Sequence, residues 1–193
     1  MMLRALVLAG GVACGAAHAQ ALEFKGVPFG APVEAFAAAN PDSSCGKAGC
    51  YQLRGAAKKP PYFAGEMVES IAASFANLDP QVGGSDCWAN CRGFSLDRVT
   101  VTFFPASFPL IADALASKYG RPTEAGTSEF RTVGGAVAAQ DTRRWLLADG
   151  GEIVIQRYAG SIRSGQMIMS SAAGRARAER ERAQQAEKAK KDI

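Results

Sequence analysis

Two neighbouring stretches decide the fold of this chain: LDRVTVTFF, at Leu96–Phe104, and PLIADALASKY, at Pro109–Tyr119. In the first stretch valine and phenylalanine alternate with threonine, which predicts a β-strand with one buried face. In the second, Ile111 and Leu115 recur at helical spacing, and the glycine directly after Tyr119 favours the end of a helix there. The sequence therefore predicts a strand followed by an amphipathic helix that covers the apolar face of a sheet.

The last third of the chain predicts a meander of antiparallel strands. The expected strands are residues 130–133, 143–148, 151–158 and 162–170. Asp149-Gly150 is typical of a two-residue hairpin turn between the second and third of these strands. The side chains expected on the buried face of this region are Trp145, Ile153, Ile155, Met167 and Met169, and Phe103, Phe104 and Phe108, earlier in the chain, are also expected in the core.

The N-terminal half repeats the helix-then-strand arrangement. A short helix is predicted within residues 29–40, because a proline stands in its first turn and Asn40-Pro41 favours its end. Residues 42–61 are expected to be irregular, and residues 67–75 fit a strand or a helix, with the strand favoured. The predicted fold class is α+β, with short helices packed on antiparallel sheet. The loose similarity of the two helix-and-proline segments leaves two readings open: two helix-plus-meander units, or a chance likeness of short alanine-rich helices.

The first 21 residues have the features of a secretory signal peptide: a basic start, an apolar run and small residues before two overlapping cleavage sites, near Ala19 and Ala21. Lipidation at Cys14 is disfavoured, because Gly11 stands where a lipoprotein signal carries a large aliphatic residue. We therefore expect a periplasmic or secreted protein with an α+β domain over residues 22–171.

Removal of the signal peptide would also remove His18, which is the single histidine of the 193 residues. Histidine is the usual general base near neutral pH and the commonest metal ligand. The expected mature chain therefore excludes a Ser-His-Asp triad, a Cys-His pair and a histidine zinc site. We predict no enzymatic activity, no cofactor and no metal.

Charge is distributed unevenly along the chain. The net charge of +4 comes from Arg4 and from residues 172–193, while the body between them carries equal numbers of acidic and basic residues. A nucleic-acid interface needs clustered lysines and arginines, so the neutral body argues against a nucleic-acid partner.

Four cysteines remain after the signal peptide, in the spacings C-x4-C and C-x3-C. In an oxidising compartment we expect them to form structural disulfides, with Cys45–Cys50 and Cys87–Cys91 as the local pairs, although sequence alone leaves the connectivity open. The second pair would enclose Trp88 and Asn90 in a small loop, where we predict a contact with a partner. The alternative is that Trp88 folds back onto the core.

Residues 172–193 form a basic tail rich in alanine, arginine, glutamate and lysine. Helix propensity is high and several i,i+4 ion pairs support it, but no apolar stripe exceeds alanine. We expect a charged helix or a disordered tail that contacts a partner, or weakly an anionic membrane surface, through its arginines. Those predicted contact residues are Arg175, Arg177, Arg180 and Arg182.

Helix-then-sheet units marked by Phe29–Glu34, Lys118–Pro122 and the final meander resemble the beta-lactamase-inhibitor-like architecture, a group that includes small outer-membrane assembly lipoproteins and secreted inhibitors. The resemblance implies a binding or scaffolding role and supplies no functional residues. We therefore predict a non-catalytic exported module that binds another cell-envelope protein.

Two alternatives stay open. The first is an inhibitor of a secreted hydrolase that presents the Cys87–Cys91 loop. The second is a glycan hydrolase that uses carboxylates alone, for which Glu66 and Glu69, or Asp149 and Glu152, are the candidate pairs.

Overall fold

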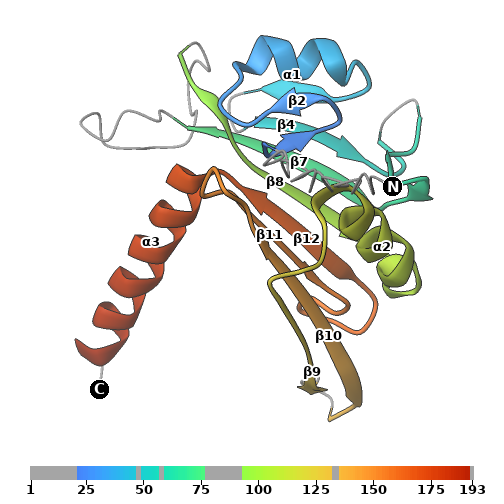
Figure 1. The fold of residues 1–193 in the computed structure, drawn as a ribbon, viewed down its shortest axis with the longest axis vertical. Helices are drawn as coiled ribbons and strands as arrows, with labels where there is room; N and C mark the ends of the chain where they lie inside the picture. The colour runs from blue at the N-terminus through green and yellow to red at the C-terminus, as the bar shows by residue number, and fades with distance from the viewer. Residues whose placement is uncertain (1–20, 47–48, 57–58, 77–92, 132–134, 192–193) are drawn as a thin grey trace, which may run out of the picture.

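A single eight-stranded antiparallel sheet organises the protein (Figure 1). The computed structural model describes residues 21–46, 49–56, 59–76, 93–131 and 135–191. The strands of the sheet are β3 (Ser44–Gly46), β4 (Gly49–Leu53), β7 (Ser70–Ala76), β8 (Ser95–Phe103), β9 (Glu124–Arg131), β10 (Val137–Leu146), β11 (Glu152–Gln156) and β12 (Gly165–Ser170). They lie in the order β3-β4-β7-β8-β12-β11-β10-β9.

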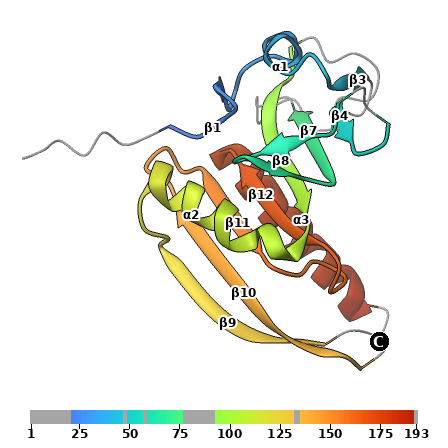
Figure 2. The same cartoon turned by 90° about the vertical axis from the view of Figure 1, so that its right-hand side faces the viewer.

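Helices lie on both sides of the sheet (Figure 2). α1 (Val33–Ala39) and α2 (Phe108–Tyr119) pack on one side, the latter preceded by the 3-10 turn η1 (Pro105–Ser107), and α3 (Ala172–Lys191) stands on the opposite side. Two small hairpins complete the described structure: β1 (Glu23–Phe24) with β2 (Val27–Pro28), and β5 (Tyr62–Phe63) with β6 (Glu66–Met67). The predicted α+β class, with helices packed on antiparallel sheet, is confirmed.

The strand order reads as two mirrored halves. α1 precedes β3, β4, β7 and β8, while α2 precedes β9, β10, β11 and β12. The last strand of each half, β8 and β12, pair with each other at the centre of the sheet. The topology thus agrees with two helix-plus-meander units, one of the two readings that the sequence left open.

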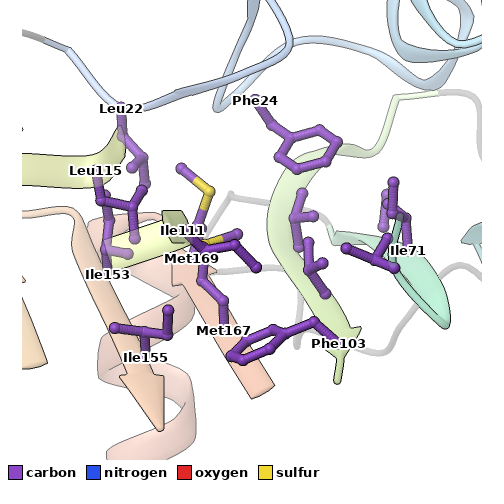
Figure 3. Close-up of a cluster of buried hydrophobic side chains, with 14 of the residues drawn as sticks. Leu22, Phe24, Ile71, Phe103, Ile111, Leu115, Ile153, Ile155, Met167 and Met169 are labelled. Carbon is purple, nitrogen blue, oxygen red and sulfur yellow. The ribbon is translucent and has the colours of Figure 1, made fainter. Parts of the chain in front are cut away.

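The core lies between the sheet and the layer of α1, α2 and the N-terminal segment. One row of side chains crosses five neighbouring strands and is almost inaccessible along its whole length: Ala73, Val99, Met169, Ile153 and Trp145. Ile111 and Leu115 of α2 approach this row from the helix side (Figure 3). The Trp145 indole Nε1 donates a hydrogen bond to the Gly120 carbonyl oxygen (2.8 Å), which ties the sheet to the end of α2.

The residues expected to be buried are confirmed with one exception. Phe103 and Phe108 are buried, but Phe104 points to the opposite face, where the Arg54 guanidinium lies 5.1 Å from its ring centre. The expectation for Phe104 was wrong because alternation along β8 places neighbouring residues on opposite faces. The favoured strand in residues 67–75 is confirmed as β7, and the tail is helical.

Three expectations about the strands were wrong. Residues 42–61 contain the β3–β4 hairpin, and Gly49 is required there, because a Cβ at this position would meet the Ala73 carbonyl oxygen at 2.2 Å. β9 begins at Glu124, well before the predicted start at residue 130. The prediction missed these residues because they are small or polar and show no hydrophobic alternation. The β10–β11 connection spans residues 147–151 and is longer than the predicted Asp149-Gly150 turn. Within it the Leu147 N–H donates to the Gly151 carbonyl oxygen, and the Gly150 N–H donates to the Leu147 carbonyl oxygen.

Candidate functional site: the open sheet face and the root of α3

The side of the sheet opposite α1 and α2 is not covered by any other described element beyond the first turns of α3. We call it the open face. Its residues alternate with the buried ones and each is at least partly accessible: Tyr51, Leu53, Ala72, Ser74, Thr100, Thr102, Gln166, Ile168, Val154, Gln156, Thr142 and Arg144.

The open face mixes apolar and hydrogen-bonding groups, and by the same alternation it also carries the charged side chains Arg98 and Glu152. One row across six strands runs from Tyr51 through Ala72, Thr100, Ile168 and Val154 to Arg144. Only the last of these six side chains is charged. Depletion of charge at the centre of a surface, with aromatic and aliphatic groups present, is typical of the core of a protein–protein interface.

Arg144 is held at the β9 end of the open face by two carboxylates. Its Nε lies 2.5 Å from Glu152 Oε1, and its Nη1 lies 3.2 Å from Glu124 Oε1. The hydrogen bond to Glu152 raises the pKa of Arg144 above its ordinary value. Beside this group lies a hollow of about 340 Å³, whose lining includes Val154 and Thr142.

A buried carboxylate anchors the root of α3 at the edge of the open face. Asp97 is the extra residue of a β-bulge in β8, where Ser74 pairs with Arg98 and Phe75 pairs with Leu96. Its side chain is fully buried at 0% exposure.

Two side chains bind the buried carboxylate, and a backbone hydrogen bond joins the same two segments. Ser171 Oγ donates to Asp97 Oδ1 (2.7 Å), Arg177 Nη2 donates to Asp97 Oδ2, and the Ser171 backbone N–H donates to the Asp97 carbonyl oxygen (2.9 Å). The Gly174 N–H in turn donates to Ser171 Oγ (3.0 Å), so the serine caps the helix. The positive end of the α3 dipole also favours a carboxylate in this position.

The four arginines predicted as partner contacts lie in two different settings. Arg177 is 16% exposed and its guanidinium is committed to Asp97, while Arg175 is half-buried and lies 3.8 Å from Glu179. Arg180 and Arg182 are exposed on the projecting part of α3, where residues 179–190 are all exposed. Arg177 thus anchors the helix, and the outer pair remains accessible.

The cysteine prediction is confirmed for the described pair. Cys45 and Cys50 lie opposite each other in the β3–β4 hairpin and form a disulfide. Cys87, Cys91, Trp88 and Asn90 lie outside the described residues. The contact role of that loop stays a prediction.

The carboxylate pairs of the hydrolase alternative are not brought together around a described cavity. Glu66 accepts a hydrogen bond from Ser107 Oγ (2.8 Å), at the end of η1. Glu69 accepts one from Ser164 Oγ (2.9 Å), directly before β12. Glu152 faces Arg144 on the open face, whereas Asp149 accepts the Leu22 N–H (3.0 Å) beside the core.

Sequence reasoning missed the open face and the role of Asp97. The signal for Asp97 was an acidic residue next to Leu96, directly before the alternation of a buried strand. The open face had no such signal, because threonine and glutamine on a strand also occur on faces that are covered by other elements.

Neither a metal-binding cluster nor a helix suited to crossing a membrane is found within the residues that the structure describes. Comparison with protein-family models, curated proteins and solved structures gives no match for this chain. The function is therefore inferred from the geometry of the open face. The resemblance to the beta-lactamase-inhibitor-like architecture stays a prediction.

Proposed function

We propose that this protein is an exported, non-catalytic interaction module that binds another cell-envelope protein on its open face. The observation that carries the proposal is an eight-stranded sheet whose second face is left uncovered by the described elements beyond the first turns of α3, with an uncharged row from Tyr51 to Val154 across it. A face of this kind, with Ile168 and Val154 near its centre, gains free energy when a partner removes it from water.

α3 frames this binding surface. It diverges from the sheet after its anchored first turns, as Figure 1 shows, and no described residue packs against its outer half. An exposed helix without apolar residues larger than alanine gains little from burial, so its role is to add polar contacts at the rim. Arg180 and Arg182 are the residues we expect to make those contacts with acidic groups of the partner.

The proposed location is the periplasm or the extracellular space. The Cys45–Cys50 disulfide supports this, because such bonds persist in oxidising compartments. The signal peptide over residues 1–21 is part of the same proposal. Leu22, the first residue after this segment, has a buried side chain and belongs to the core.

Charge substitution on each side of the sheet tests the proposal. Ile168→Glu places a carboxylate at the centre of the open face, and Leu110→Glu does the same on the exposed outer surface of α2, where Leu110 is 56% exposed. We expect a crosslinked envelope complex to form with wild type and Leu110→Glu and to be lost with Ile168→Glu, while all three proteins have the same circular dichroism spectrum. A complex that survives in the folded Ile168→Glu variant would reject the open face as the binding surface.

A further inference from the structure

A second candidate site lies on the helical side of the sheet, away from the open face. It is a cavity of about 300 Å³ bounded by the C-terminal half of α2 and by two hairpins. Both hairpins have two-residue turns at positive φ, Lys25-Gly26 in β1–β2 and Ala64-Gly65 in β5–β6. Lys25, Ala64 and Gly65 line the cavity, so the two turns lie at its mouth.

The walls and floor of the cavity are apolar. Leu115 and Met169 belong to the core, at 3% and 1% exposure, and both line the cavity; Figure 3 shows them among the buried side chains. Phe63 and Tyr119 form the sides, and Tyr62, 52% exposed, stands at the entrance. The apolar cavity thus extends from the surface to the core, and binding sites for small molecules have this character.

The charges at the rim favour an anion. Glu23 is already paired with Lys118 (2.6 Å), and Tyr119 Oη donates to the Glu23 carbonyl oxygen (3.0 Å). Among the described residues no carboxylate lies within ion-pair distance of Lys25, whose Nζ lies 5.8 Å from the centre of the Phe24 ring. Partial desolvation lowers the pKa of Lys25, and the charge of Asp42 opposes this only in part. Within the described part of the chain, the ammonium group therefore has no carboxylate close enough for an ion pair.

We propose that this cavity binds a small single-chain amphiphile with a carboxylate head, whose apolar chain lies on Leu115 and Met169 and whose head pairs with Lys25. A neutral ligand would leave Lys25 without its partner, and a cationic one would be repelled by it. The site goes beyond the proposed function, because the cavity lies on the helical side of the sheet and shares no residue with the open face.

Calorimetric titration with decanoate, decanol and decyltrimethylammonium tests the proposal on the full chain. We expect saturable binding of decanoate at one site, about fivefold weaker binding of decanol, as an exposed ion pair contributes, and the weakest binding for the cation. Lys25→Gln should remove the preference for decanoate, and Lys188→Gln, on exposed α3, should keep it.

A pair of tryptophan variants locates the ligand. Ala114 is exposed and lines the cavity, so Ala114→Trp should fill the cavity and abolish binding. Ser117→Trp, on the same helix but outside the cavity, should bind as wild type does, and so should Ile168→Glu on the open face. Absence of saturable binding, equal binding of the cation, or full binding by Ala114→Trp would overturn the proposal.

Discussion

Asp97 shows how one residue decides where a whole helix stands. Its carboxylate is fully buried in a β-bulge and is shared by Ser171 and Arg177, which flank the first two turns of α3. Removal of one partner from a buried ion pair is costly, because the other charge then remains desolvated and unpaired. The orientation of α3 beside the open face therefore depends on this single side chain.

The substitution Asp97→Asn tests that dependence. It keeps the shape of the side chain but leaves Arg177 without its counter-charge, so we expect a loss of about 3 kcal/mol in the free energy of unfolding. Urea denaturation measures the change, and Asp113→Asn, at an exposed carboxylate of α2, should change it by less than about 0.5 kcal/mol. Equal stabilities for Asp97→Asn and wild type would show that the pair does not anchor α3.

Gly174 is constrained by the same carboxylate. A Cβ at position 174 would lie 2.8 Å from both oxygens of Asp97. We therefore expect Gly174→Ala to destabilise the protein by about 2 kcal/mol through overpacking, even though alanine is the better helix former. Gly126→Ala is the matched control, because its Cβ would meet nothing within 4 Å.

Limited proteolysis distinguishes a local effect from a global one in these variants. Gly174→Ala should expose the α3 root to cleavage at Arg177 at protease concentrations that leave wild type intact. If Gly174→Ala has the same free energy of unfolding as wild type and is cleaved at the same protease concentrations, the contact between Gly174 and Asp97 does not constrain the helix.

At the scale of elements, the N-terminal β1–β2 hairpin is fastened to α2 by the Lys118–Glu23 ion pair. Burial alone would lower the pKa of Lys118, but the hydrogen bond to Glu23 and the neighbouring charges outweigh it and raise this pKa above its ordinary value. A raised pKa stabilises the folded state below the unfolded-state value of about 10.4, and that stabilisation is lost as the pH rises through the folded-state pKa.

The pH dependence of stability tests this pair. We expect the difference in free energy of unfolding between wild type and Lys118→Gln to be constant up to about pH 9 and to shrink towards about pH 12. The measurement is urea denaturation at each pH. Lys188→Gln, at an exposed site on α3, should show no such trend. A difference for Lys118→Gln that stays constant or grows with pH would contradict the assignment.

The elements with clear hydrophobic periodicity were predictable from sequence, and those without it were not. β8 and α2 each bury one regular face, so alternation and helical spacing identified them within a residue or two. β9 and the β3–β4 hairpin lie at the two edges of the sheet, where side chains are small or polar. Their strand conformation comes from pairing with a neighbour, which local sequence does not encode.

At the scale of the whole molecule, the arrangement of elements was partly predictable and the candidate sites were not. Two similar helix-and-proline segments suggested two units. The strand order agrees with this, because β3, β4, β7 and β8 form one half of the sheet and β9, β10, β11 and β12 form the other. The open face depends on α1 and α2 packing on the same side of the sheet, and the cavity depends on two hairpin turns meeting at α2. Both result from tertiary packing between segments distant in sequence.

The same arrangement places the two proposed surfaces on opposite sides of one sheet. The helical side contains the core and the cavity proposed to bind an amphiphile, and the open side has an uncharged row from Tyr51 to Val154. A protein partner and a small ligand could therefore bind at the same time without competing for residues. The proposed function requires that the open face is the surface that contacts the partner.

Site-specific photocrosslinking in cells tests that claim most directly. A photoreactive phenylalanine analogue would replace Thr102 or Ile168 on the open face, or Leu110 on the outer surface of α2. We expect one adduct of the same mass from Thr102 and Ile168 and none of that mass from Leu110. Adducts from Leu110 alone, or no adduct from either open-face position in a folded protein, would contradict the account.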